Sequence, residues 1–171
     1  MDDFKILKQM GEDGAQGVVS LVEFPNGLRS AMKQFKKTKS TARIQQEADF
    51  QRKAAEAGIA PEVMHVDLKH RRIFMEPMAS RVIDVLKVPP FNQFGEDLEL
   101  IMRKLDDLDI LHNDGNALNL MLDSDGCLRI IDFGLAKKIT KAVRKKWDGQ
   151  PNIKVTLFMI KKGLRKYNIH L

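Results

Sequence analysis

The apolar residues of this chain recur at helical spacing in several stretches. The spacing predicts one helix from about Thr41 to Ala57, for which Ser40 or Thr41 is a suitable N-cap, and a second from Phe94 to Ile110. The apolar stripe of the second helix consists of Leu98, Ile101, Met102, Leu105 and Leu108. Toward the C-terminus the pattern predicts two amphipathic helices, the later one beginning near Pro151.

Short apolar runs bounded by turn residues predict strands. Val63–Val66 and Arg72–Met75 are expected to pair with each other, and Leu120–Leu122 and Leu128–Ile131 are expected to form a hairpin around a turn-rich tetrapeptide. Pro89–Pro90 marks a loop before the second helix. The pattern therefore predicts paired strands in both halves of the chain.

Composition favours an intracellular protein. With 171 residues, the chain can bury one good core or two small lobes that share a hinge. Its single cysteine, Cys127, argues for a reducing compartment and against a disulfide framework. No apolar stretch approaches the length of a membrane span, and the acidic start at Met1–Asp3 is unlike a secretion signal. We therefore expect a cytoplasmic protein, with the cytoplasm of a host cell as an alternative, and no membrane span.

Charge is distributed unevenly along the chain. The net charge is +6, yet residues 137–171 contain eleven Lys or Arg and one acid, Asp148, a balance of +10 that leaves −4 for the rest. A basic end of this kind is usually the solvated face of helices. It also suits contact with an acidic protein partner, a nucleic-acid backbone or an anionic surface, and of these we favour the acidic protein over nucleic acid.

Two short motifs carry candidate chemistry. His112–Asn119 has the form H-x-D-x-x-x-x-N, and Asp132–Gly134 is D-F-G. Asp114 can serve as a base for an acceptor hydroxyl, while Asn119 and Asp132 offer the hard oxygen ligands that Mg²⁺ prefers. The predicted hairpin would return Asn119 and Asp132 to one edge. A buried hairpin with a helix-capping Asp114 is the alternative, but the two motifs in this order favour phosphoryl transfer.

At these motifs the chain resembles the protein kinase superfamily, over about Ile6 to Lys137. The resemblance implies an α+β, bilobal fold with a β-rich N-lobe and a truncated helical C-lobe. Residues 1–76 would form the N-lobe and residues 77–171 the C-lobe, together one kinase domain. The implied cofactors are ATP and Mg²⁺, with Mn²⁺ as an alternative metal.

The glycine-rich phosphate loop of that family corresponds to Gly11–Val19. Gly14, Gly17 and Val19 fit the latter half of the pattern G-x-G-x-x-G-x-V, whereas Gly11 lies one residue too far upstream, as if the loop had an insertion. Glycines suit such a loop because backbone N–H groups must approach phosphates without a Cβ in the way. A plain hairpin turn is the alternative for this string taken alone.

The resemblance also assigns an ion pair in the first half of the chain. Ser30–Lys33 resembles the strand motif V-A-I-K, whose lysine contacts the α- and β-phosphates of ATP. Glu47 on the first predicted helix is the best candidate for the partner of Lys33. An exposed glutamate that pairs along its own helix is the alternative for Glu47.

The segment after the second predicted strand pair resembles the hinge between kinase lobes. By this resemblance Met75 is the gatekeeper, and the backbone at Glu76 and Met78 hydrogen-bonds adenine. Ala31 and Val19 would pack on the faces of the adenine ring. All five residues are therefore candidate cofactor-binding positions.

Several departures point to an atypical kinase. Asn113 stands where the family has the arginine of H-R-D, Asn116 replaces a lysine, and no A-P-E motif follows Gly134. Over Arg43 to Asp67, which contains Glu47–Ala48 and Gly58–Pro61, the chain is similar to the PRPK-type kinases of the KEOPS complex. Its small size resembles the NleH and OspG effector kinases and miniature viral kinases.

We expect a minimal ATP- and Mg²⁺-dependent serine/threonine protein kinase that phosphorylates a protein hydroxyl without a standard activation segment. The alternatives are a nucleotide-binding regulatory module, a PRPK-like ATPase within a partner complex, and a kinase of small molecules.

The last apolar segment should support this site. It consists of Val155, Leu157, Phe158, Met159 and Ile160. We expect the helix that carries it to dock beneath His112 and Asp114, in place of the buried helix on which a standard kinase packs its catalytic loop.

Overall fold

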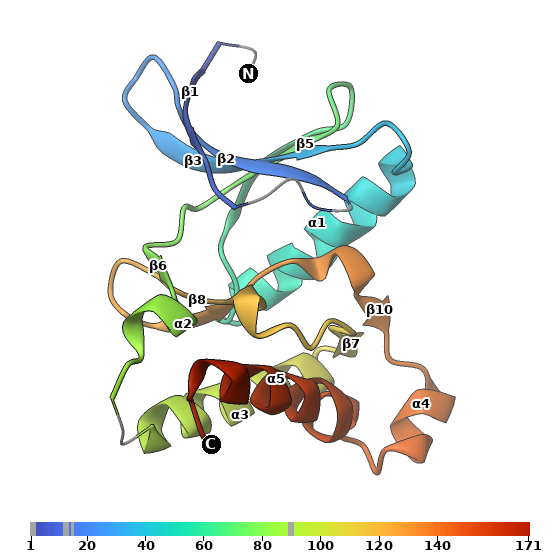
Figure 1. The fold of residues 1–171 in the computed structure, drawn as a ribbon. Coiled ribbons are helices and arrows are strands. Elements are labelled where there is room, and N and C mark those ends of the chain that lie inside the picture. The colour runs from blue at the N-terminus through green and yellow to red at the C-terminus, as the bar shows by residue number, and fades with distance from the viewer. Residues whose placement is uncertain (1–2, 12–13, 15, 89–90) are drawn as a thin grey trace.

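The computed structural model describes residues 3–11, 14, 16–88 and 91–171, which form two lobes (Figure 1). Residues 12–13 and 15 of the glycine-rich loop and the expected Pro89–Pro90 loop lie outside the described residues. The N-terminal lobe is an antiparallel sheet of order β1-β2-β3-β5-β4 with one helix beside it. Its elements are β1 (Lys5–Gln9), β2 (Gly17–Glu23), β3 (Arg29–Phe35), α1 (Thr41–Glu56), β4 (Val63–Asp67) and β5 (Arg72–Met75).

The second lobe is mainly helical and carries two small sheets, β6-β8-β9 and β10-β7. Its elements are β6 (Ser80–Arg81), α2 (Val82–Val85), α3 (Asn92–Asp107), β7 (Ile110–Leu111), β8 (Leu120–Leu122), β9 (Leu128–Ile130), β10 (Lys137–Lys138), α4 (Lys141–Lys146) and α5 (Leu157–Leu164). A π-helical stretch, Asn152–Thr156, leads directly into α5. The arrangement confirms the predicted α+β, kinase-like bilobal fold.

The predicted helices and strands are present, with shifted ends. Ser40 caps α1 by accepting a hydrogen bond from the Arg43 amide at 3.3 Å, as its position suggested. The helix predicted to end at Ile110 stops at Asp107, because Asp109 turns into the left-handed region with φ 57° and Ile110 starts β7. The earlier of the two predicted C-terminal helices is α4, which begins only at Lys141, while Lys137–Lys138 pairs with β7 as a strand.

Separate apolar clusters hold the two lobes. In the N-terminal lobe, Phe35, Ile44, Ala48 and Ile73 are buried between the sheet and α1. In the second lobe, one large cluster unites α3, the β8-β9 hairpin, Phe133 and α5. Within the described residues, no helix is both long and apolar enough to cross a membrane.

Helix α5 packs against the 112–119 loop, which confirms the predicted docking. A Cβ at Gly115 would overlap the Cβ of Met159, and a Cβ at Gly163 would lie 3.2 Å from that of Ala117. Helix α5 and the loop can approach this closely because each contact has a glycine on one side. The docking does not bury the whole apolar segment: Phe158 and Met159 are 67% and 52% exposed, although Met159 still contacts Gly115.

A buried asparagine ties the start of this helix to the loop. The Asn152 side chain accepts a hydrogen bond from the His112 amide at 3.0 Å and donates to the Ile110 carbonyl at 2.7 Å. It also donates to Asp106 Oδ1 at 2.7 Å. Burial without these partners would cost about 1–3 kcal/mol. The segment after α4 is therefore joined to the loop by polar contacts as well as by packing.

Replacing Leu164, which is fully buried, with alanine should lower the free energy of unfolding by about 2–5 kcal/mol, because a cavity forms beneath the loop. Phe158→Ala on the same helix removes a larger but exposed side chain and should change it by less than about 0.5 kcal/mol. Urea denaturation compares the two variants. Equal losses would contradict the assignment of the buried face.

Candidate active site

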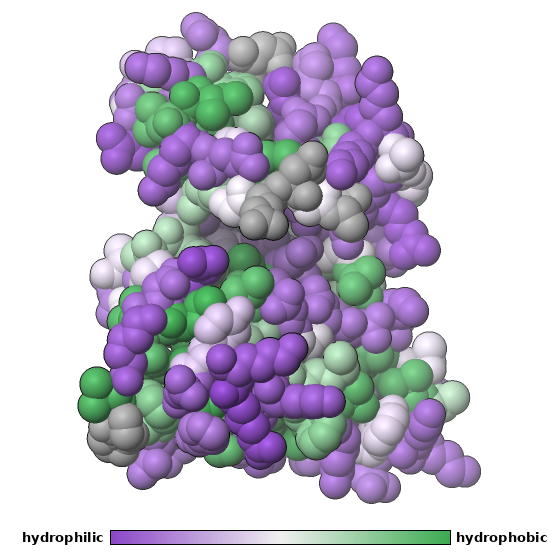
Figure 2. All heavy atoms as spheres, in the orientation of Figure 1, coloured by the Kyte–Doolittle hydropathy of each residue, from purple (hydrophilic) through white to green (hydrophobic). Residues whose placement is uncertain are grey.

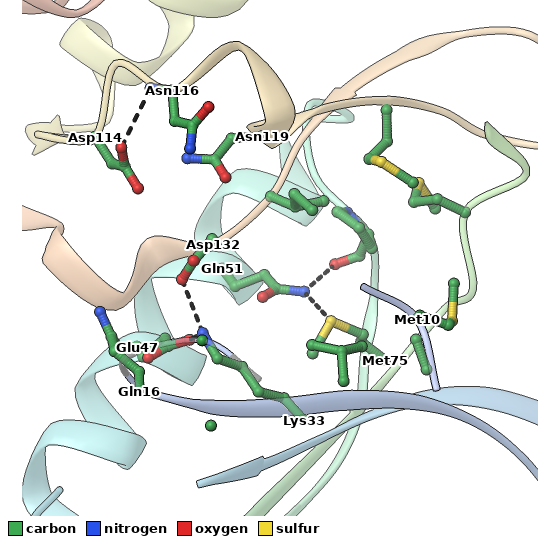
Figure 3. Close-up of a pocket in the computed structure, with 18 of the residues that line it drawn as sticks. Met10, Gln16, Lys33, Glu47, Gln51, Met75, Asp114, Asn116, Asn119 and Asp132 are labelled. Carbon is green, nitrogen blue, oxygen red and sulfur yellow. Dashed lines mark hydrogen bonds and ion pairs between the residues drawn. The ribbon is translucent and has the colours of Figure 1, made fainter. Parts of the chain in front are cut away.

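A cavity of about 520 Å³ lies between the lobes and gathers nearly all of the predicted site residues (Figure 3). Those that line it are Gly14, Gly17, Val19, Ala31, Lys33, Glu47, Met75, Glu76, Met78, Asp114, Asn119 and Asp132. Gly11 does not line the cavity: it is an exposed residue with φ 92°, just past the end of β1. The extra residue in the loop thus leaves Gly11 outside the cavity.

An ion-pair chain crosses the inner end of the cavity. Lys33 Nζ on β3 lies 2.6 Å from Glu47 Oε1 on α1 and 2.8 Å from Asp132 Oδ1, just after β9 (Figure 3). Burial alone would lower the pKa of Lys33, but the two carboxylates outweigh it and raise that pKa above its ordinary value. Burial opposes ionisation of Asp132 as well, yet Lys33 holds the pKa of this carboxyl below its ordinary value.

A second lysine, which the motifs did not indicate, completes this chain. Lys39 Nζ lies 2.5 Å from Glu47 Oε2 and also bonds the side chain of Gln16 in the glycine loop. The Gln16 amide packs so closely on Gly134 that a Cβ there would overlap it. The contacts therefore connect α1, the glycine loop and the D-F-G segment. Lys39 carried no sequence signal, because it is one of 29 Lys and Arg residues and belongs to no motif.

The 112–119 loop is held by a buried histidine. The His112 ring nitrogens lie 3.1 Å from the carbonyl oxygens of Asp114 and Ile131, and the ring packs edge-on against Phe133. Burial lowers the pKa of His112, although both carbonyls favour the protonated ring. Asn113 has φ 61° and donates from Nδ2 to the Leu135 carbonyl at 3.2 Å, so it fastens the loop to the D-F-G segment.

The oxygen-bearing side chains of the two motifs face the same cavity. Asp114 and Asn119 lie together on the side opposite Lys33, with Asp132 between them and the lysine (Figure 3). Asp132 accepts both of its hydrogen bonds at Oδ1, from Lys33 and from the Gly134 amide at 3.3 Å, which leaves Oδ2 available. Asn119 is buried and its Nδ2 has no hydrogen-bond partner among the described residues.

At the hinge, one backbone group of the predicted adenine-binding residues is already used within the protein. The Glu76 amide is already bonded to the Glu62 carbonyl at 2.9 Å, because β4 and β5 continue to pair for one residue beyond the strands. The carbonyl of Glu76 and the backbone of Met78 are left for a ligand.

Gln51 also lines the inner wall, where its amide donates to the Pro61 carbonyl at 3.1 Å. Gln51 belongs to none of the motifs, so the sequence did not indicate its place in the cavity.

Comparison with known proteins supports the class that this fold and cavity define. The chain is 37% identical over 91 residues to a probable cyclin-dependent kinase 9 of Schizosaccharomyces pombe, an alignment that covers 46% of this chain. The aligned part is only 15% of that relative's length. No protein-family model matches the chain. The similarity supports a relationship to the protein kinase superfamily.

Replacing Lys39 with methionine should lower the free energy of unfolding by about 1–3 kcal/mol, because the buried Glu47 loses one of its two cationic partners. Lys39→Arg should recover part of the loss. Lys145→Met is the control, since Lys145 is exposed and has no ion pair in the described part of the chain. Chemical denaturation measures all three; a Lys39→Met variant as stable as the control would mean that the second ion pair contributes nothing.

Proposed function

We propose that this protein is an ATP- and Mg²⁺-dependent protein kinase that transfers the γ-phosphate to a serine or threonine hydroxyl of a protein, without a standard activation segment. The observation that carries the proposal is the convergence of Asp114, Asn119 and Asp132 with the Lys33–Glu47 pair on one cavity. Phosphoryl transfer depends mainly on positioning and charge stabilisation, which this arrangement can supply.

The cavity suits a nucleotide. Its volume of about 520 Å³ lies within the usual range of small-ligand sites, roughly 300–1,000 Å³. Val19 and Ala31 line it beside the available carbonyl of Glu76, a combination that suits a flat base with polar edges. Lys33 and the glycine loop lie at the inner end, where phosphates would meet an ammonium group and backbone N–H groups.

The residues present also fit a magnesium ion. Asp132 offers Oδ2, which has no hydrogen bond to a described residue, and Asn119 offers its amide oxygen, the hard donor type that Mg²⁺ prefers. Among the described residues there is no group of three His, Cys, Asp or Glu side chains that could hold a metal by itself. Mg²⁺ commonly binds through one or two protein ligands together with substrate phosphates. When bound, it would neutralise charge that develops on the phosphates.

The chain's own residues would then divide the reaction between them. Lys33 holds the phosphates, and Glu47 with Lys39 holds Lys33 in place. The acceptor hydroxyl oxygen attacks the γ-phosphorus while the bond from that phosphorus to the bridging oxygen breaks, and its electron pair leaves with ADP. Asp114 takes the hydroxyl proton. The Oδ1 atom of Asp114 accepts a hydrogen bond from the backbone N–H of Asn116 at 3.2 Å, which orients the carboxylate.

Asp132→Asn and Lys33→Met should each lower phosphate transfer by about 100-fold or more, because each removes a charge that acts on the transferred group. Asp125→Asn, in the exposed turn of the β8-β9 hairpin, should leave the rate unchanged. The assay uses labelled ATP with generic protein acceptors and also measures free phosphate. Wild-type rates in both site variants would contradict the proposal, and phosphate release without labelled protein would favour an ATPase.

Activity should not require phosphorylation of the enzyme, because Asn113 replaces the arginine that would bind a phosphorylated loop and is instead bonded to Leu135. Protein treated with phosphatase, freed of it and then assayed should transfer phosphate at the rate of untreated protein. A mock-treated sample is the control. A lasting loss of activity that autophosphorylation restores would contradict this expectation.

A further inference from the structure

Helix α5 brings a basic surface to the edge of the 112–119 loop. Met159 contacts Gly115, the residue after the proposed base, and Gly163 approaches Ala117. Residues three or four apart on a helix are surface neighbours, with Cβ atoms about 5–6 Å apart. Lys162, three positions after Met159, therefore lies beside the row that touches the loop, and Arg165 and Lys166 follow in the 3₁₀ turn Arg165–Tyr167 that continues α5.

These cations are not used within the protein. Lys162, Arg165 and Lys166 are exposed and have no ion pair or hydrogen bond to any residue that the structure describes. We call these three residues the α5 basic surface. Lys161 differs because it points toward α3 and pairs with Glu99 at 3.3 Å. Strongly hydrophilic side chains gather over α5 on this face of the lower lobe (Figure 2).

We propose that the α5 basic surface binds an acidic peptide segment of the protein whose hydroxyl is phosphorylated at Asp114; this inference rests on the proposed function. The charge of the surface is complementary to such a segment, and exposed Met159 and Phe158 offer apolar contact beside it. A peptide that presents its hydroxyl to Asp114 must pass close to Gly115, and hence to Met159 and the next row of α5.

The geometry limits where the acidic residues should be. An extended chain advances about 3.3 Å per residue. Lys162 is a surface neighbour of Met159, which touches the loop at Gly115. Carboxylates about two to four residues from the acceptor serine would therefore reach the ammonium groups of the α5 basic surface. Reversing two surface charges replaces attraction with repulsion. Without any reversal, the few exposed ion pairs that one Glu peptide can form should together favour its binding over a neutral peptide by about tenfold.

The experiment compares three peptides of equal length, each with one serine flanked at these positions by Glu, Gln or Lys. The full chain should phosphorylate the Glu peptide with a kcat/KM about tenfold above that for the Gln peptide, mainly through KM. Lys162→Glu/Lys166→Glu should abolish this preference and improve the Lys peptide. Lys5→Glu/Lys69→Glu makes the same charge change on exposed lysines of the other lobe that have no ion pair with a described residue, and it should leave the preference unchanged. Thermal unfolding verifies that both double variants are folded.

Binding of the fluorescent Glu peptide, measured by anisotropy, tests the surface separately from the reaction. If no peptide is phosphorylated, the proposed function fails, but the surface is still supported when binding is lost only in the Lys162→Glu/Lys166→Glu variant. Equal kcat/KM for the three peptides, or equal binding to both double variants, overturns the inference. A single-stranded RNA that displaces the Glu peptide at much lower concentration would also overturn it, in favour of a nucleic-acid surface.

Discussion

The buried carboxylate of Glu47 is the constraint on which the rest of the site depends. It is 3% exposed and lies between two ammonium groups, those of Lys33 and Lys39. A buried charge is costly unless it is paired, so α1 must keep Glu47 where both lysines reach it. Lys33 extends the chain of contacts to Asp132, and Lys39 extends it through Gln16 to the surface of Gly134. Asp132 and Gly134 are therefore the two ends of one series of contacts, and this series encloses the inner end of the cavity.

In the second lobe, a buried asparagine likewise fixes the position of neighbouring segments. Asn152 connects Asp106 on α3, the Ile110 carbonyl and the His112 amide, and all three contacts lie within 3.0 Å. Apolar packing by itself tolerates sliding, whereas a buried amide is satisfied in one position only. The 112–119 loop is therefore held on one side by its bonds to Ile131 and Leu135, which flank the D-F-G residues, and on the other side by Asn152.

The fold was largely readable from the sequence, because hydrophobic spacing marks α1, α3 and the hairpins whatever their surroundings. The motif residues could be recognised because their types, order and separation along the chain form a known pattern, and the fold brings them to one cavity. Lys39, Gln16 and Asn152 were not found. Each acts through side-chain contacts between segments that no local spacing connects, and Lys39 and Gln16 lie outside any periodic element. The end of α3 and the start of α4 could not be read from the sequence. The left-handed turn at Asp109 and the pairing of Lys137–Lys138 with β7 are tertiary effects.

Asn113 and α5 together explain how so small a lower lobe can hold a rigid loop. Asn113 adopts a left-handed backbone, which asparagine tolerates better than most residues, and its short amide reaches the Leu135 carbonyl. The loop is thus fastened to the D-F-G segment by its own side chain. Helix α5 then needs only to fill the space beneath, with Leu157, Ile160 and Leu164 turned inward. Because that burial occupies one face of α5, the opposite face is free to carry charge at the edge of the loop.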